Sequence, residues 1–254
     1  MKVKFLGTGT SQGVPVITCQ CEVCKSLDYR DKRFRASIHV EVDDKSLVVD
    51  TGPDFRMQML NASVKNLDAI IYTHEHKDHT AGLDDIRPFN FVQKKDMPIY
   101  GRKQVLEQIK TEFAYVFSDK KYPGVPQIKA IEINDAPFEI GGTEIIPLPV
   151  WHYKLPVYGF RIKDFAYITD TNNIPEETLV LLKNLDVLVL NALQKAPHIS
   201  HFTLEEAIEM AQKIGAKRTF FTHISHRLGM HDEVEQSLPD GIFLGYDGLE
   251  VVLN

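Results

Sequence analysis

The sequence predicts a single α/β domain over residues 1–254. Short runs of β-branched and aromatic residues alternate with segments whose apolar residues recur at helical spacing, a pattern typical of α/β proteins. Several of the strand-like runs end on histidine or aspartate. The apolar content of 43% and charged content of 25% are ordinary for a globular protein, and 254 residues suffice for one large domain.

In the first half we expect two helices. One begins at Pro53, because proline suits a first helical turn, and runs to residue 62. The other covers 104–117, where apolar residues recur at helical spacing. The β-rich runs of this half are 2–6, the hairpin arms 37–42 and 45–49, and 69–73.

In the second half the clearest helix signal is Thr203, with Glu206 three residues later. This capping-box pattern predicts a helix that ends before Gly215. A shorter helix is expected over 178–183. The predicted strands are 143–150, 165–169, 187–190 and 218–222.

Charge and hydropathy disfavour two classes of partner. The net charge of −6 and pI of about 5.9 argue against stable nucleic-acid binding. No apolar run reaches the roughly 18 residues needed to cross a bilayer, and no leader pattern precedes the first strand. We therefore predict a cytoplasmic protein without a membrane partner, and the sequence leaves a homodimer open.

The strongest functional signal is the segment His74-Glu75-His76-Lys77-Asp78-His79, which follows the strand-like run 69–73. Three of the ten histidines in the chain lie within these six residues. A strand that ends in a ligand-rich loop lets side chains converge on one point. Imidazole and carboxylate at this density suit zinc, manganese or iron, whereas the alternative is a solvated polar turn.

Three more ligand-type residues stand at or just after the ends of predicted strands in the second half. His152 follows 143–150, Asp170 follows 165–169, and His223 follows 218–222. Each of them alone would more often be an ordinary polar residue. Together with the first segment they predict one metal centre assembled from strand ends.

The pattern His-x-His-x-Asp-His, followed by these three residues in this order, resembles the metallo-β-lactamase superfamily. The resemblance implies a four-layer αββα sandwich and two divalent metal ions, manganese or zinc. It assigns His74, His76 and His152 to the first ion, and Asp78, His79 and His223 to the second, with Asp170 bridging both. Related redox di-iron proteins usually carry Glu at the position of His76, so His76 favours hydrolysis.

Asp50 lies at the end of the second hairpin arm, where the superfamily often places a carboxylate that orients the ligand loop. The alternative is a cap for the following helix. The sequence does not decide between the two.

The three cysteines of the chain are Cys19, Cys21 and Cys24. This spacing without a leader predicts a zinc site rather than disulfides, and a tetrahedral site needs a fourth ligand, for which His226 is the candidate. The alternative is a set of reduced thiols.

A combination of motifs resembles one branch of the superfamily, the phosphoribosyl 1,2-cyclic phosphate phosphodiesterases of the carbon–phosphorus lyase pathway. The motifs are the cysteine loop, Gly7-Thr8-Gly9-Thr10, Thr169-Asp170-Thr171 and Thr222-His223-Ile224-Ser225-His226. The resemblance runs from Gly7 to Glu250. It implies a structural zinc on the cysteines and His226, and a general acid or base at His201. His198, three residues earlier, is the alternative.

The predicted function is therefore metal-dependent hydrolysis of a small, cyclic phosphodiester, with His201 and Asp78 as catalytic residues. Ring opening needs a proton for the leaving alkoxide, and a histidine with a pKa near its ordinary value of about 6.5 can supply it at neutral pH. The alternatives are a thioester or lactone hydrolase of the glyoxalase II or lactonase kind, a tRNA 3′-processing-like nuclease, and a non-catalytic zinc-binding module.

Overall fold

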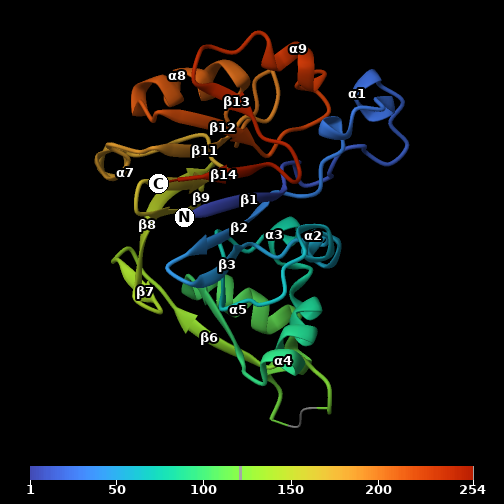
Figure 1. Cartoon of the computed structure of the whole chain (residues 1–254), viewed down its shortest axis with the longest axis vertical. Coiled ribbons are helices and arrows are strands. Elements are labelled where there is room, and N and C mark those ends of the chain that lie inside the picture. Colours follow the sequence, from blue (N-terminus) through green and yellow to red (C-terminus); the bar gives the residue numbers. More distant parts are fainter. Residues whose placement is uncertain (120–121, 254) are drawn as a thin grey trace.

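The structure, a computed structural model, describes residues 1–119 and 122–253. Within these ranges the strands form two seven-stranded sheets (Figure 1). The first has the order β14-β1-β2-β3-β4-β5-β6, and the second has the order β13-β12-β11-β10-β9-β8-β7. The strand β14, near the C-terminus, pairs antiparallel with β1 and forms an edge of the first sheet.

Each predicted strand run coincides with a strand of the structure, whereas the strands at 97–101, 128–132, 138–140, 155–162, 242–244 and 250–252 were not predicted. The strands of the first sheet are β1 (Lys2–Gly7), β2 (Ser37–Val42), β3 (Lys45–Val49), β4 (Ala69–Ile71), β5 (Met97–Gly101), β6 (Ile128–Glu132) and β14 (Glu250–Val252). Those of the second are β7 (Phe138–Ile140), β8 (Thr143–His152), β9 (Leu155–Ile162), β10 (Phe165–Ile168), β11 (Val187–Asn191), β12 (Arg218–Thr222) and β13 (Ile242–Leu244).

The helices of the described ranges are α1 (Glu22–Lys25), α2 (Phe55–Ala62), α3 (Lys77–Thr80), α4 (Arg87–Gln93), α5 (Lys103–Glu112), α6 (Ala114–Phe117), α7 (Glu176–Leu181), α8 (Leu204–Ile214) and α9 (His231–Glu235), with 3₁₀ turns η1 (Tyr29–Asp31) and η2 (Leu83–Ile86). Of these, α2 and α5 pack on the outer face of the first sheet, and α8 packs on the outer face of the second. No helix in the described ranges is both long and apolar enough to span a bilayer.

Three apolar layers hold the molecule together. One lies between the sheets and joins Phe5 of β1 to Phe160 of β9. The second packs Ala207 of α8 on the outer face of the second sheet, and the third packs Phe55 of α2 on the first. Three apolar interfaces separate four layers, so the predicted αββα sandwich is confirmed.

Two helix predictions need comment. The helix at Thr203 is confirmed, because Thr203 and Glu206 form a capping box and Gly215 ends α8 with a φ of 71°. The single helix expected over 104–117 is wrong. Phe113 leaves the helical region, with φ −108° and ψ 40°, and this divides the segment into α5 and α6.

A close approach of two loops positions the ligand-rich segment after β4. Thr51 N–H donates to the carbonyl of His79, and Gly82 N–H donates to the carbonyl of Thr51. A Cβ added to Gly52 would lie 2.1 Å from the carbonyl oxygen of Asp78, so only glycine permits this contact. The loop after β3 therefore supports the loop that carries His74 to His79.

Candidate binuclear metal centre

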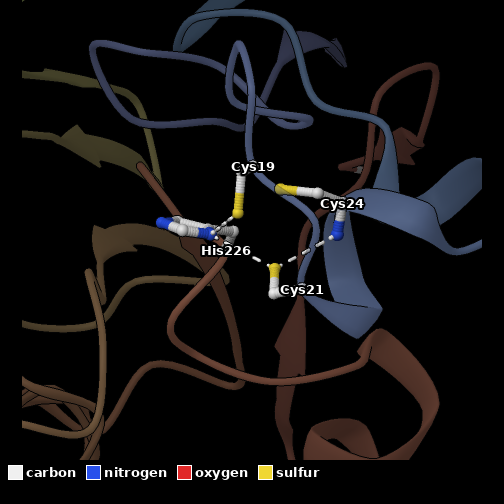
Figure 2. A group of neighbouring side chains, drawn as sticks. All are labelled: Cys19, Cys21, Cys24 and His226. Carbon is white, nitrogen blue, oxygen red and sulfur yellow. Dashed lines mark hydrogen bonds between the residues drawn. The ribbon is translucent and has the colours of Figure 1, made fainter.

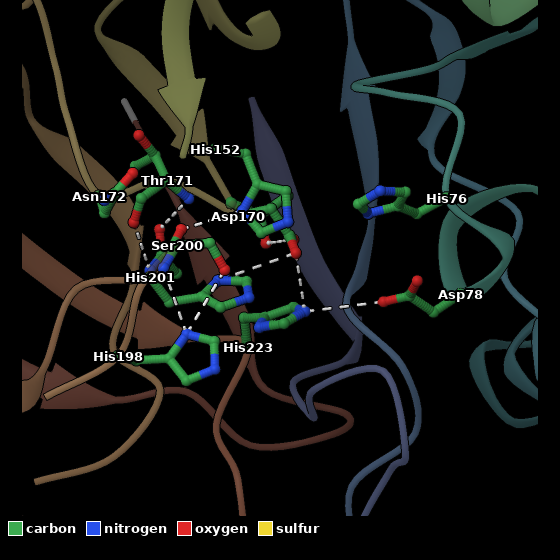
Figure 3. Close-up of polar contacts among 12 residues, drawn as sticks. His76, Asp78, His152, Asp170, Thr171, Asn172, His198, Ser200, His201 and His223 are labelled. Atoms are coloured by element: carbon green, nitrogen blue, oxygen red, sulfur yellow. Dashed lines mark hydrogen bonds and ion pairs between the residues drawn. The ribbon is translucent and has the colours of Figure 1, made fainter. Parts of the chain in front are cut away.

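The predicted catalytic ligands lie together where the two halves of the sandwich meet. Figure 3 shows His76 and Asp78 entering from the α3 side, and His152, Asp170, His201 and His223 entering from the opposite side. The ligand atoms gather in groups with mutual distances within 4.8 Å. These groups are His74, His76 and His152, then Asp78, His79, Asp170 and His223, and finally His152, Asp170 and His201.

Asp170 stands at the centre of this arrangement. Its Oδ2 lies 3.2 Å from His79 Nε2, and its Oδ1 lies 3.0 Å from His223 Nε2. It belongs to the group with His79 and His223 and also to the group with His152. Asp170 is thus in contact with ligand-type residues from both predicted sets, and its bridging role stays a prediction.

Donors and acceptors around the ligands orient their rings. His74 Nδ1 lies 3.0 Å from Thr73 Oγ1, and its Nε2 lies 3.0 Å from His76 Nδ1. His152 Nδ1 lies 2.9 Å from the carbonyl oxygen of Ser200. In His74 and His152, one ring nitrogen is therefore held by an outer partner while the other is turned toward the cluster.

The structure decides the role of Asp50. Its Oδ2 lies 2.7 Å from His79 Nδ1 and accepts from Thr73 Oγ1, while its Oδ1 accepts from Thr73 N–H. The cap position before α2 is occupied by Asp54 instead. Asp50 therefore orients the ligand loop, and the capping alternative is excluded.

Backbone conformation helps to aim three of these side chains. Asp50, Asp170 and His223 have φ values of 66°, 54° and 55°, in the left-handed region that non-glycine residues rarely adopt. Each lies one or two residues beyond the end of a strand. Such residues cluster at functional sites, where the surrounding structure offsets a cost on the order of 1–3 kcal/mol each.

The negative charge of the buried carboxylates makes this cluster suitable for binding cations. Burial opposes a charge on His79, but the carboxylates of Asp78, Asp170 and Asp50 outweigh it and raise the pKa of His79 well above its ordinary value. For His223, burial is likewise outweighed by Asp170, and its pKa is raised to about 9. This negative potential is what a divalent cation would neutralise.

Buried nitrogen atoms without a hydrogen-bond partner give a second test of whether these residues suit a metal ion. Among the described residues, the buried His79 Nε2 and His223 Nε2 find no hydrogen-bond partner, although both lie within ion-pair distance of Asp170. Buried polar atoms are normally hydrogen-bonded. Nitrogen and carboxylate donors that face one another in this way match the ligand chemistry of zinc or manganese.

His201 lies inside the cluster, whereas His198 lies outside it. The His201 ring centroid is 4.5 Å from that of His152 and 4.7 Å from that of His223, and its side chain is buried. His198 is exposed, with its ring 5.0 Å from that of His201. Of the two candidates for proton transfer, His201 is therefore the one in contact with the metal ligands.

The electrostatic environment of His201 differs from the expectation. Burial, with a further contribution from His223, lowers its pKa to about 3, so the free site holds a neutral imidazole at pH 7. This shift could not be read from the sequence, which does not reveal that the side chain of His201 is buried beside other histidines.

The structure also brings the cysteine cluster together. Figure 2 shows Cys19, Cys21 and Cys24 facing His226, which comes from the loop after β12. His226 Nδ1 lies 3.2 Å from Cys19 Sγ and 3.3 Å from Cys21 Sγ, and the four ligand atoms lie within 4.8 Å of one another. The thiols form no disulfide, and three sulfurs with one imidazole match a structural zinc site.

Sequence reasoning missed several residues that support the ligands. Thr73 contacts both His74 and Asp50, and Thr169 Oγ1 donates to Asp170 Oδ2 at 2.7 Å. Asn191 receives the N–H of Thr171 on Oδ1 and donates Nδ2 to the carbonyl of Thr171. The threonine that precedes His74, Asp170 and His223 was the available signal.

The match to a known family covers the part of the chain that carries most of this centre. The family model described as a β-lactamase superfamily domain matches residues 45–224. The chain belongs to the metallo-β-lactamase superfamily. It is accordingly a hydrolase of a family that uses divalent metals, and the residues gathered at this centre are the ligand types of that family.

Individual relatives extend the similarity. The crystal structure of a diphosphatase from the PhnP family is 40% identical, with a TM-score of 0.93, and the alignment covers 100% of this chain and 98% of that one. An octanoyltransferase from Porphyromonas gingivalis (strain ATCC BAA-308 / W83) is 39% identical over 257 residues, covering 100% of this chain and 52% of that protein. The chain thus spans about half the length of that relative.

A more distant relative is a ribonuclease Z from Pyrobaculum neutrophilum. It is 25% identical over 269 residues, which cover 89% of this chain and 88% of that protein.

Replacement of Asp50 tests its orienting role. We expect Asp50→Asn to lower metal affinity or turnover about 10- to 100-fold, the usual effect of losing an outer partner of a metal ligand. An amide cannot accept from Thr73 and His79 with the strength of a carboxylate. Metal retained after dialysis against a chelator, measured by elemental analysis, and kcat are the readouts.

The matched control for Asp50 is Asp44→Asn. Asp44 is exposed in the hairpin and, with a φ of 59°, shares the left-handed backbone of Asp50. It should behave as the unmodified protein does. Equal metal retention by the Asp50 and Asp44 variants would show that Asp50 does not support the ligands.

Proposed function

We propose that this chain is a binuclear metal-dependent phosphodiesterase that hydrolyses a small, cyclic phosphodiester. The observation that carries the proposal is the position of Asp170, between His79 on one side and His223 on the other and within reach of His152. A single shared carboxylate between two groups of ligands is the arrangement expected of a two-metal hydrolase.

The residues divide into two ligand sets. His74, His76 and His152 would hold one ion, Asp78, His79 and His223 the other, and Asp170 would contact both. Two divalent cations bound there, manganese or zinc, would activate a water and stabilise negative charge that develops on a phosphoryl group.

His201 is proposed to serve the leaving group. Its Nδ1 is buried, lies 3.9 Å from Asp170 Oδ1 and has no hydrogen-bond partner among the described residues. Because its pKa is lowered to about 3 in the free site, it would have to take up a proton from solvent when the substrate binds. A phosphodiester anion beside the ring favours the protonated imidazole, which can then donate to the departing alkoxide.

Two relatives suggest rival substrates. The 40% identical structure is that of a diphosphatase, which makes a diphosphate ester the first rival. The octanoyltransferase, of which this chain covers only part, makes an acyl thioester the second. Neither substrate is excluded by the ligand geometry, so turnover must decide.

A substrate panel tests the proposal. We expect protein loaded with manganese or with zinc to hydrolyse a cyclic phosphodiester of ribose and bis(p-nitrophenyl) phosphate faster than a diphosphate ester, S-lactoylglutathione or an octanoyl thioester. Chelation that leaves the fold intact should abolish turnover. Preference for either thioester would overturn the proposal, and turnover that survives complete metal removal would exclude the metal-dependent mechanism.

His201→Ala tests the proton transfer. A ribose alkoxide is a poor leaving group and needs a proton, whereas p-nitrophenolate does not. We expect kcat on the cyclic ribose substrate to fall about 10²- to 10⁴-fold, the usual range for general acid–base catalysis, with a much smaller loss on the nitrophenyl ester. Metal content should remain unchanged. Equal losses on both substrates, or a selective loss in His198→Ala instead, would contradict the assignment.

A further inference from the structure

Asn172, two residues after Asp170, lies where two loops of the site meet. Asn172 Oδ1 accepts from the backbone N–H of Tyr153 at 2.9 Å, one residue after the ligand His152. Asn172 Nδ2 donates to the carbonyl of Ile199 at 3.0 Å, two residues before His201. One side chain thus joins the turn that carries a metal ligand to the loop that carries the proton donor.

The loop that Asn172 holds has few other restraints on its outer side. Residues 195–199 are exposed, and Ile199 keeps 66% of its surface accessible. The inner end of the loop is attached by Phe202 N–H, which donates to the carbonyl of Thr171, and by Ser200, whose carbonyl contacts His152 Nδ1. Figure 3 shows Asn172 and Thr171 beside Ser200 and His201.

The segment after β10 is itself rigid, which makes it a good anchor. Thr171 N–H donates to Asn191 Oδ1, and Thr171 Oγ1 donates to the carbonyl of Trp151. Asn191 and Thr171 are fully buried, whereas Asn172 is half-buried at the surface of the site. Asn172 therefore extends a buried scaffold outward to an exposed loop.

We propose that Asn172 is a positioning residue that sets the distance between His201 and the metal ligands by bonding to Tyr153 and Ile199 at once. An outer hydrogen bond of this kind restricts the ring to a productive geometry, and a displacement of about 1 Å is enough to lower turnover substantially. The catalytic consequence rests on the proposed function, but the structural one does not.

The variants separate the two bonds. Asn172→Ala removes both, whereas Asn172→Asp keeps an acceptor for Tyr153 N–H and places an oxygen against the carbonyl of Ile199. Asn173→Ala is the matched control, because Asn173 is exposed and its contacts among the described residues run through its backbone.

Hydrogen–deuterium exchange of the metal-loaded protein measures positioning without any assumption about substrate. We expect faster exchange over 198–203 in both Asn172 variants, and faster exchange around Tyr153 in Asn172→Ala alone. Asn173→Ala should exchange as the unmodified protein does. Unchanged exchange over 198–203 in Asn172→Ala would overturn the proposal, whatever the enzyme hydrolyses.

Kinetics then distinguish positioning from a general loss of structure. On the cyclic ribose substrate, kcat of Asn172→Ala should fall about 10- to 100-fold, the range for outer partners of a site, while KM and metal content change little. The loss on bis(p-nitrophenyl) phosphate should be much smaller. Equal losses on both substrates, or loss of metal, would show a structural role only. If the unmodified protein hydrolyses neither compound, the proposed function fails, and the exchange result still decides the role of Asn172.

Discussion

Asp170→Ala is expected to lower phosphodiester turnover by at least about 10³-fold and to reduce metal content. Asp170 is buried, contacts both His79 and His223, and also belongs to the group that contains His152. Stabilisation of charge by metal ions contributes several kcal/mol to catalysis, and each ~1.4 kcal/mol corresponds to a factor of ten in rate. The measurements are kcat with manganese or zinc in excess, and metal per chain by elemental analysis.

The fold should survive this change, because Asp170 lies beyond the end of β10 and outside the apolar layers. Asp164→Ala provides the control: Asp164 is exposed at the opposite end of β10, and its variant should remain active and bind metal normally. Asp170→Asn keeps the shape of the side chain without its charge and should also be impaired. A fully active Asp170→Ala protein would disprove the binuclear mechanism.

Cys21→Ser is expected to release one zinc and to lower Tm by roughly 5–10 °C. Cys21 Sγ contacts His226 Nδ1 and accepts from Cys24 N–H at 3.5 Å. The cluster joins the N-terminal loop to the loop after β12, because Cys21 and His226 are in contact although 205 positions separate them in the chain. Metal binding contributes directly to folding free energy, and a loss of about 1 kcal/mol lowers Tm by about 2–4 °C at this chain length.

Calorimetry and elemental analysis check this result, and Lys25→Ala is the control. Lys25 is the last residue of the short helix α1, for which Cys21 is the N-cap, and it is exposed and supplies no ligand atom. Its variant should keep its zinc and its Tm, and Cys21→Ser should keep the metals of the catalytic centre. If Cys21→Ser loses neither stability nor metal, the cysteines hold no zinc and His226 has another role.

Local sequence patterns were sufficient to predict many of the strands and helices of this protein. The strand before each ligand is encoded by its own β-branched and aromatic residues, so 69–71, 165–168 and 218–222 formed where expected. The capping box of Thr203 also depends on neighbours in sequence, and it was predicted correctly. Because the ligands sit at strand ends, the resemblance to a known family located them without coordinates.

Contacts between distant segments decided the rest. The sequence allowed Asp50 either to orient the ligand loop or to cap the following helix. Its 2.7 Å contact with His79, 29 positions away, decided for the orienting role. The pKa of His201 is lowered to about 3 by burial among other histidines, which no local pattern encodes.

The sequence by itself determined the α/β class, the candidate ligand types and the strand ends on which they stand, because these follow from periodicity and residue chemistry over short segments. The four-layer sandwich was expected only from the resemblance to the superfamily. Only the tertiary structure decided which side chains orient those ligands. Thr73 contacts His74 and Asp50, and the Ser200 carbonyl contacts His152, through hydrogen bonds whose length and angle depend on loops brought together by folding. Such bonds form between loops that are distant in sequence, and an ordinary threonine or serine does not reveal them.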